Sequence, residues 1–263
     1  MISSTANSQI KNIIQLQKKS KERRQQGVFV IEGIKMFEES LEYGSIQKAY
    51  VSYHLFEELQ KNKVDYFKDI PYEIVTDSVF KDISDTLTPQ GILAIVKMPS
   101  YSLTDLISRE EANLVLLEDI RDPGNLGTIL RTAEGAGFTG IILSKESVDM
   151  YNPKVIRSTM GAIYRMPFLY VDNFLETLTY LKENGITIYA AHLQSDYYHD
   201  EVTYEDRCAI MIGNEANGLS DESSKCSSKY IKIPMSGKVE SLNAAVATSV
   251  LMYEIYRQRR LRK

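Results

Sequence analysis

The sequence predicts an α/β protein with two domains, the second built on a mainly parallel sheet with helices on both faces. Short apolar runs of strand length alternate with helical patterns along the chain of 263 residues. In the second half these runs are unbroken, which is typical of strands buried on both faces of a parallel sheet. With 43% apolar residues, the chain has enough hydrophobic side chains for two cores.

A smaller α/β domain is expected over residues 1–100. Helical patterns occupy Gln9 to Lys19 and the segment IKMFEESLEYG, which ends at Gly44. Strands are predicted in three apolar runs: GVFVIEG (27–33), IQKAYVS (46–52) and ILAIVKM (92–98). The next stretch, PSYSLTDLISREEA, is rich in small and polar residues, so we expect a linker over residues 101–112.

The larger domain is expected over residues 113–263. Helical patterns lie between several of its predicted strands, and this alternation favours a parallel sheet. The predicted strands are NLVLLED (113–119), GIILS (140–144), MPFLYV (166–171), ITIYAAH (186–192), CAIMIGN (208–214) and KYIKIPM (229–235).

Composition excludes several classes of protein. The net charge of −4 argues against a wholly basic nucleic-acid coat, and no run approaches the roughly 18 apolar residues that a membrane helix needs. No early segment has the pattern of a signal peptide, so we expect a cytoplasmic protein. Cys208 and Cys226 are too few for a disulfide framework, and neither they nor the three histidines have the spacing of metal ligands. We therefore expect no bound metal.

Both ends of the chain are basic in spite of the negative net charge. Lys18, Lys19, Arg23 and Arg24 lie near the start, and four arginines and a lysine close the chain after residue 256. Either end can meet the phosphates of a nucleic acid. The alternatives are a solvated helix face at the start and, at the end, cations that favour the negative pole of the last helix.

The hexapeptide GAGFTG (135–140) matches the G-x-G-x-x-G pattern of dinucleotide-binding folds. Such glycines must follow a strand and open a helix, because the helix N-terminus faces the pyrophosphate. Here the preceding NLGTILRTAE is helical, with Asn125 as its predicted cap, and the following IILS is a strand. We therefore expect Gly137 to cap the end of a helix and Gly140 to form a tight turn into the strand.

Gly127, Arg131 and Gly135 fall at i, i+4 and i+8 of that helix and therefore share one stripe. An arginine flanked by glycines near a helix N-terminus can bind a phosphate or a ribose. The alternative is an arginine held in a structural salt bridge, for instance to Glu134.

Two loops farther along indicate a ligand site at the carboxyl edge of the sheet. The strand IMIG runs into the polar loop NEANGLS, which carries Asn214, Glu215 and Gly218 at the usual place for ligands in open α/β sheets. The strand YIKIPM leads to SGKVESLNAAVA, where Ser241 and Asn243 open a long, mostly apolar helix.

Three stretches of the second domain resemble the ordered motifs of the SpoU/TrmH-type RNA 2′-O-ribose methyltransferases of the SPOUT superfamily. They are NLGTILRTA, IMIGNEANGLS and IPMSGKVESLNAAVA, and the match spans most of residues 113–257. The N-terminal part, with IKNIIQLQKKSKERRQQGVFVIEG and LTPQGILAIV, is similar to the ribosomal-protein-like RNA-binding domain that many members carry.

The resemblance implies a catalytic domain with a deep C-terminal trefoil knot, and a homodimer whose active site is completed across the interface. The mostly apolar last helix agrees with a dimer interface, although a helix buried within one chain has the same composition. The resemblance also implies that S-adenosylmethionine binds in the knotted loops, mostly to backbone groups. Carried over position by position, the cofactor contacts are Leu193, Gly213, Asn214, Gly218, Ile233, Met235, Ser241 and Leu242.

The resemblance assigns four polar residues to the catalytic site: Asn125, Arg131, Glu215 and Asn243. Methyl transfer from a sulfonium requires in-line alignment of the ribose 2′-oxygen and loss of its proton. Because a guanidinium stays protonated in proteins, Arg131 is a poor general base. Our hypothesis is that Arg131 holds the phosphate or the developing alkoxide, while the proton leaves late or through another group.

One position departs from the family pattern. Where many members have a serine two residues after the asparagine of the third motif, this chain has Ala245. A hydroxyl donor to the RNA phosphate is therefore missing there, which leaves Arg131, or Ser241 and Asn243, to bind that phosphate.

The resemblance favours ribosomal RNA, 23S RNA in particular, as the substrate. The residues expected to contact RNA are Lys18, Lys19, Arg23, Arg24 and Arg131. Transfer RNA is an alternative, because members that modify tRNA share the catalytic motifs. A non-catalytic RNA-binding or ribosome-assembly protein on the same fold is a further alternative, against which the intact motif residues argue. The topology around GAGFTG disfavours a nicotinamide enzyme.

Overall fold

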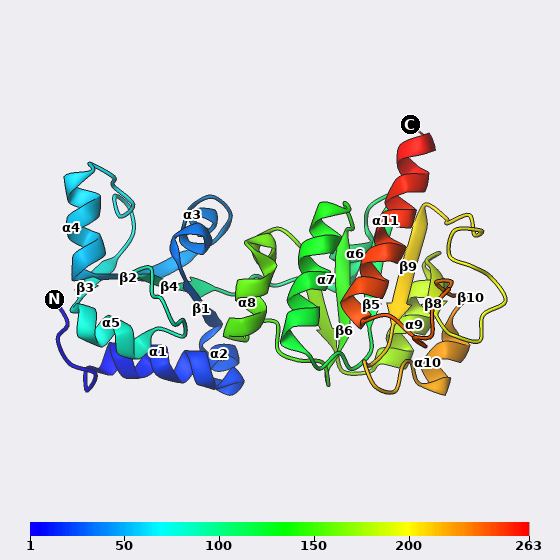
Figure 1. The fold of residues 1–263 in the computed structure, drawn as a ribbon, viewed down its shortest axis with the longest axis horizontal. Helices are drawn as coiled ribbons and strands as arrows, with labels where there is room; N and C mark the ends of the chain where they lie inside the picture. Colours follow the sequence, from blue (N-terminus) through cyan, green and yellow to red (C-terminus); the bar gives the residue numbers. More distant parts are fainter. Residues whose placement is uncertain (263) are drawn as a thin grey trace. The chain divides into compact units, whose positions relative to one another are not determined.

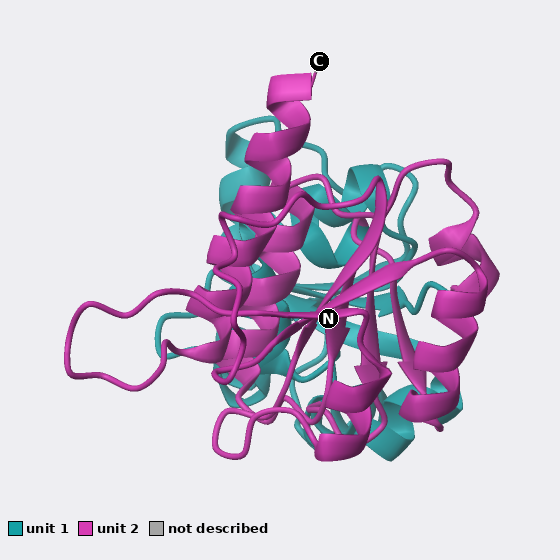
Figure 2. Cartoon of the chain, turned by 90° about the vertical axis from the view of Figure 1, so that its right-hand side faces the viewer, with its two compact units in different colours: residues 1–100, 149–164 teal, residues 101–148, 165–263 magenta. Residues whose placement is uncertain are grey.

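The computed structural model describes residues 1–262 and contains two compact units, each with its own sheet (Figure 1). Unit 1 comprises residues 1–100 and 149–164, and unit 2 comprises residues 101–148 and 165–263, the last of which is not described (Figure 2). The segment 149–164, which the sequence pattern assigned to the larger domain, thus packs with the smaller one.

Unit 1 is built on a four-stranded sheet of order β1-β4-β2-β3. Strand β4 runs antiparallel to β1 and β2, whereas β2 and β3 are parallel. The strands are β1 (Val28–Glu32), β2 (Ile46–Ser52), β3 (Tyr72–Val75) and β4 (Ile92–Lys97). The helices are α1 (Ser8–Lys18), α2 (Ser20–Gln26), α3 (Ile34–Tyr43), α4 (Tyr53–Lys61), α5 (Asp77–Ile83), α8 (Pro153–Thr159) and the 3₁₀ helix η1 (Ala162–Tyr164).

The core of unit 1 contains the apolar face of α1. Ile10, Ile13 and Leu16 recur every third residue along this helix and are fully buried. They belong to one hydrophobic cluster with Val28 and Val30 of β1. Burying each of these large aliphatic side chains contributes roughly 2 kcal/mol to folding.

Arg23, which was expected to contact RNA, is buried and cannot reach a phosphate. Only 3% of the residue is exposed. Its guanidinium donates to the carbonyls of Leu16 and Gln17 at 2.6 and 3.1 Å and forms an ion pair with Asp149. Arg23 therefore attaches the segment that begins at Asp149 to the N-terminal helices of unit 1. Lys18, Lys19 and Arg24 are exposed.

Unit 2 contains a six-stranded sheet of order β10-β8-β9-β5-β6-β7, in which every neighbouring pair is parallel. The strands are β5 (Ala112–Leu117), β6 (Gly140–Ser144), β7 (Phe168–Val171), β8 (Thr187–Ala191), β9 (Arg207–Ile212) and β10 (Lys229–Ile231). The helices are α6 (Leu103–Ile107), α7 (Pro123–Gly135), α9 (Phe174–Glu183), α10 (Asp221–Cys226) and α11 (Ala244–Arg262).

Helices cover both faces of this parallel sheet, which confirms the predicted fold class. Leu114 and Leu116 of β5 pack in one cluster with side chains of α6 and α9. Because successive strand residues point to opposite faces, Val115 and Leu117 face the other side, where α7 and α11 lie (Figure 1). Within residues 1–262, no helix is long and apolar enough to span a bilayer.

The two ends of α7 differ in part from what the sequence predicts. Asp122 is the N-cap, and its side chain accepts from the N–H of Asn125 at 2.8 Å, so Asn125 lies inside the first turn and does not cap the helix. Gly137 ends the helix as expected, with φ of +72°. Gly140 is the first residue of β6 and forms no turn. A Cβ there would lie 2.7 Å from Leu106, so close packing explains this glycine.

The expected linker at 101–112 contains the short helix α6. Ser102 and Asp105 form a reciprocal capping box at its start. Leu106 and Ile107 at its end are buried in the core of unit 2. The polar composition of this stretch therefore reflects capping and exposed turns around two buried apolar residues.

We expect Arg23→Met to lower the free energy of unfolding by about 3 kcal/mol, because it leaves Asp149 without its buried cation while keeping most of the side-chain volume. Urea denaturation measures the loss. The control Arg24→Met removes an exposed cation of the same helix and should change stability by less than about 0.5 kcal/mol. Equal losses in both variants would contradict the structural role of Arg23.

Candidate functional site

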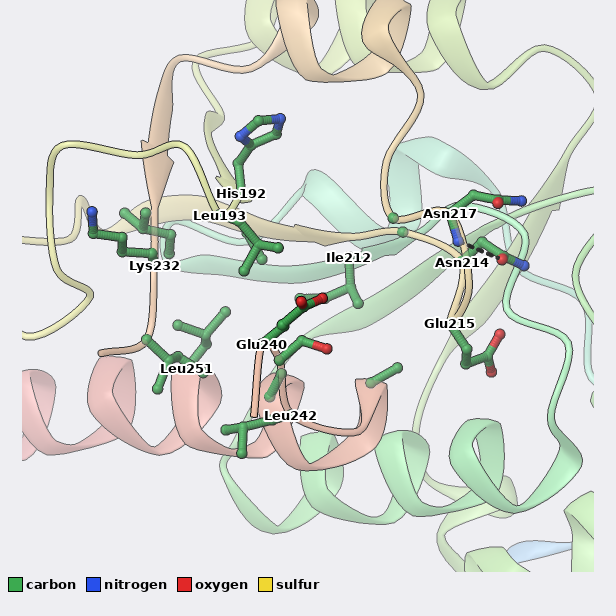
Figure 3. A pocket seen from close by; sticks show the side chains of 18 of the residues that line it. His192, Leu193, Ile212, Asn214, Glu215, Asn217, Lys232, Glu240, Leu242 and Leu251 are labelled. Carbon is green, nitrogen blue, oxygen red and sulfur yellow. Dashed lines mark hydrogen bonds between the residues drawn. The ribbon is translucent and has the colours of Figure 1, made fainter. Parts of the chain in front are cut away.

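A cavity of about 290 Å³ opens at the carboxyl edge of the sheet in unit 2 (Figure 3). Ala191, Ile212 and Ile231, the last residues of β8, β9 and β10, lie in its wall. Ligands commonly bind at this edge, because the loops that leave parallel strands meet there. The wall includes all eight residues expected to contact a cofactor: Leu193, Gly213, Asn214, Gly218, Ile233, Met235, Ser241 and Leu242.

The loop after β9 turns so tightly that glycine is required at its start. A Cβ on Gly213 would lie 2.1 Å from the backbone of Gly218, and Gly218 has φ of +69°. The N–H of Asn214 donates to the carbonyl of Gly218 at 3.0 Å, and the N–H of Gly218 donates back at 2.9 Å. The backbone therefore folds back on itself at the cavity wall.

The strand predicted over 229–235 ends at Ile231, and the rest of that run contributes to the cavity. Ile233 and Met235 lie in the wall on either side of Pro234. A proline cannot donate a ladder hydrogen bond, which is consistent with an early end of this edge strand. Leu242, just before α11, and Leu251, within that helix, add further apolar surface.

A chain of side-chain hydrogen bonds joins the three sequence motifs next to the cavity. The amide of Asn125 donates to the carboxylate of Glu215 at 3.0 Å. The amide of Asn243 donates to the side-chain oxygen of Asn125 at 2.9 Å. Asn243 also begins α11, because its side-chain oxygen accepts from the N–H groups of Ala245 and Val246. Three of the four predicted catalytic residues are thus in direct contact.

Glu215 is held in its ionised form by this arrangement. Burial alone would raise its pKa, but donation from the Asn125 side chain and from the backbone N–H groups of Arg121 and Asp122 outweighs burial and lowers the pKa below 4.5. The carboxylate acts as an acceptor for three donors of the β5–α7 segment. Its location therefore favours a role in holding two loops together over proton transfer.

Glu118, directly after β5, is a second carboxylate that anchors the loop after β9. It accepts from the N–H of Ser220 at 2.8 Å and from the hydroxyls of Ser220 and Ser223 at 2.7 and 2.6 Å. The side chain of Asn214 donates to the carbonyl of Asp119 at 2.8 Å. Both ends of the loop are therefore attached to the segment between β5 and α7.

Arg131 lies apart from the other three catalytic candidates. It is exposed on α7 and does not line the cavity of its own chain. Glu134, the expected alternative partner, pairs instead with Arg165 at 2.9 Å. Within the described residues Arg131 has no hydrogen bond or ion pair, so its guanidinium is free to bind an anion from outside the chain.

Sequence reasoning missed three chargeable residues in the cavity wall: His192, Lys232 and Glu240. His192 follows β8, and its ring stacks on Tyr230 with centroids 4.7 Å apart. Glu240 lies within the third motif and Lys232 directly before it, so the available signal was a charged residue next to a predicted cofactor contact.

Ala245, the departure from the family pattern, lies in the first turn of α11. Only 3% of it is exposed, and its N–H donates to the Asn243 side chain at 2.9 Å. A hydroxyl on this side chain would point into a buried environment in this chain. The substitution therefore removes no surface contact from the single chain.

Two other kinds of chemistry receive no support from the site. Among residues 1–262, no three His, Cys, Asp or Glu side chains lie close enough together to hold a metal ion. Burial raises the pKa of the Cys208 thiol to about 12, so this cysteine stays protonated and is a poor nucleophile.

Unit 2 and its cavity define an α/β domain with a cofactor-sized site formed by the loops of its last strands. Residues 112–253 match the model of the SpoU rRNA Methylase family, and residues 7–94 match the MRM3-like substrate binding domain. The chain belongs to the SpoU rRNA methylase family and is a methyltransferase of that class.

Two curated relatives align over most of the chain. The 23S rRNA (guanosine(2553)-2′-O)-methyltransferase RlmP of Bacillus subtilis is 30% identical over 97% of this chain and 98% of its own length. The human mitochondrial rRNA methyltransferase 3 is 32% identical over 90% of this chain and 69% of its own length.

Solved structures share the whole architecture. The AdoMet-bound rRNA methyltransferase from Sinorhizobium meliloti superposes with a TM-score of 0.86 at 28% identity, covering 97% of both chains. An RNA 2′-O ribose methyltransferase superposes with a TM-score of 0.82 at 29% identity, covering 98% of both chains. The SpoU methyltransferase AviRb from Streptomyces viridochromogenes, at 24% identity, shares the fold with a TM-score of 0.85.

We expect Glu215→Gln to weaken binding of S-adenosylmethionine roughly tenfold, because a glutamine amide would oppose one of the N–H donors at Arg121 and Asp122. Isothermal titration measures the affinity. Glu222→Gln, an exposed acid on α10, is the control and should bind as the wild type does.

The variant Glu215→Gln should also differ from the wild type in how its stability depends on pH. The folded-state pKa of Glu215 is lowered, so its stabilising contribution is complete above 4.5 and is lost as pH falls through the folded-state value. Unfolding measured against pH should therefore show an acid-limb loss in the wild type that is smaller in Glu215→Gln. An identical acid limb in both proteins would contradict this assignment.

Proposed function

We propose that this chain transfers a methyl group from S-adenosylmethionine, bound in the cavity of unit 2, to a ribose 2′-hydroxyl of ribosomal RNA. The observation that carries the proposal is the hydrogen-bonded set Glu215–Asn125–Asn243, which brings the three motifs together beside one cavity. A relative named as a 23S rRNA 2′-O-methyltransferase, which aligns over 97% of this chain, supports the substrate class.

The cavity has the chemistry that S-adenosylmethionine requires. Apolar side chains such as Leu193, Leu242 and Leu251 can enclose an adenine ring, while backbone groups of the tight loop at Gly213 can meet its polar edge. When bound, the cofactor supplies an electrophilic methyl group. The residues of this chain then have to orient the ribose, exclude water and stabilise the charge on the attacking oxygen.

Arg131 has the properties of a group that binds RNA. A guanidinium stays protonated, so it cannot accept the hydroxyl proton, but its planar donors suit a phosphate or a developing alkoxide. Its exposure and lack of a partner within the described chain support this role.

A homodimer accounts for the separation between Arg131 and the cavity of its own chain, because a second copy can bring its arginine to that cavity. The outer side of α11 supports this assembly: Val246, Tyr253 and Tyr256 are 49%, 50% and 40% exposed. Large apolar and aromatic side chains on one helix are typical of interface anchors. The trefoil knot implied by the family resemblance stays a prediction.

Unit 1 is proposed to bind the RNA substrate. The match of residues 7–94 to a substrate-binding domain supports this role. Lys18, Lys19 and Arg24 are exposed cations on α1, α2 and the turn between them, where they can contact phosphates. We also propose that the protein acts in the cytoplasm, on the ribosomal RNA.

The test is to map ribose methylation across ribosomal and transfer RNA in cells with and without the gene. We expect one 2′-O-methyl mark on ribosomal RNA to disappear and to return with the wild-type gene. Loss of a 2′-O-methyl mark from tRNA instead would identify tRNA as the substrate. An unchanged methylation pattern in all of these RNAs would contradict the proposed enzymatic activity.

We expect Arg131→Lys and Arg131→Ala to lose at least about 100-fold in turnover while binding S-adenosylmethionine within about twofold of wild type, because the proposed partner of the guanidinium is the RNA and not the cofactor. Arg109→Lys, exposed before β5, is the matched control and should keep full activity. Near-normal turnover in Arg131→Lys would show that planar recognition by guanidinium is dispensable.

A further inference from the structure

Glu240 is a carboxylate in the cavity wall whose charge has no counterpart within the described chain. It belongs to the segment between β10 and α11, and it lines the cavity together with Ser241 and Leu242. Figure 3 labels Glu240 among the side chains that line the cavity. Within residues 1–262, Glu240 has neither a hydrogen bond nor an ion pair to another side chain.

Each of the other chargeable side chains in the cavity wall has a partner within the chain. The Glu215 carboxylate accepts from Asn125 and from two backbone N–H groups. The ammonium of Lys232 lies over the ring of Tyr198, 5.2 Å from its centroid. His192 stacks on Tyr230. Glu240 is thus the wall residue, within the described chain, that offers an unpaired full charge.

The segment that carries Glu240 is anchored just beyond it. Asn243, three residues later, caps α11 and donates to Asn125 at 2.9 Å. This attachment fixes the chain just beyond Glu240. Glu240 itself is exposed, so its carboxylate is open to a ligand charge that enters the cavity.

The charge of Glu240 matches one part of the proposed cofactor. The methionine end of S-adenosylmethionine carries a sulfonium and an ammonium, whereas its adenosine part is neutral. RNA is an unsuitable partner for this side chain, because a carboxylate repels phosphates.

We propose that Glu240 is a specificity residue that recognises the positive charge on the methionine end of S-adenosylmethionine. This inference rests on the proposed function, since it takes the cavity to be the cofactor site. The carboxylate would face one of the two cations of S-adenosylmethionine, either the sulfonium or the α-ammonium. If the sulfonium is the partner, the attraction is lost when methyl transfer leaves a neutral thioether, and the product is released more readily than the substrate cofactor.

The test measures binding by isothermal titration for the full-length protein with three ligands. S-adenosylmethionine carries both cations, S-adenosylhomocysteine carries only the ammonium, and 5′-methylthioadenosine carries neither. We expect Glu240→Gln to bind S-adenosylmethionine about tenfold more weakly than wild type and 5′-methylthioadenosine within about twofold. Glu240→Asp, which keeps the charge, should recover part of the lost affinity.

S-adenosylhomocysteine distinguishes the two cations. An equal loss of affinity for S-adenosylmethionine and S-adenosylhomocysteine identifies the ammonium. A loss of affinity confined to S-adenosylmethionine identifies the sulfonium. The control Lys238→Gln neutralises an exposed charge of the same loop outside the cavity wall and should leave all three affinities unchanged.

Two results would overturn the role of Glu240. Unchanged affinity of Glu240→Gln for S-adenosylmethionine would show that the residue does not recognise the cofactor. An equal loss of affinity for 5′-methylthioadenosine would mean that the residue shapes the loop without recognising charge. Failure of the wild-type protein to bind any of the three ligands would instead refute the proposed cofactor site, so the two failures are distinguishable.

Discussion

The carboxylate of Glu215 is the contact on which the whole site depends. It lies 90 residues after Asn125 in the sequence, yet it accepts from that side chain and from the two backbone N–H groups at the entrance to α7. Through Asn125 the connection reaches Asn243, which is 118 residues after Asn125 and lies at the start of the last helix. Without this acceptor, several donors would face one another at the meeting point of three loops, and unpaired donors next to a partly buried site are costly.

Helix α7 presents Asn125 and Arg131 on two different faces because of the helical repeat. Asn125 and Arg131 are six residues apart, which corresponds to a rotation of about 240° around the helix. The first therefore faces the interior and completes the hydrogen-bonded set, while the second faces solvent. One rigid element thus carries both the residue that fixes the loops and the residue available to an incoming polyanion.

Much of this arrangement could be predicted from the sequence. The buried runs at β5, β6 and β9 do not alternate with polar residues, so their place in a parallel sheet could be predicted. The eight expected cofactor residues do surround one cavity.

Pairings between side chains far apart in the sequence could not be predicted. Asp122 and Asn125 are both good caps, and only the packing of the first turn decides between them. Arg23 looks like its exposed neighbour Arg24 until Asp149 is found beside it. The unpaired charge of Glu240 likewise depends on which side chains surround it in space.

The segment 149–164 determines how the chain is divided between the two structural units. It leaves the methyltransferase unit after β6, forms α8 and η1 within unit 1, and returns to build β7. Asp149 supplies the counter-charge to Arg23, and α8 packs on β1. A fragment cut at residue 100 therefore has a hole in its core and a stranded cation. Unit 1 is therefore not a detachable module, because its architecture is completed by a segment that the chain inserts between β6 and β7 of unit 2.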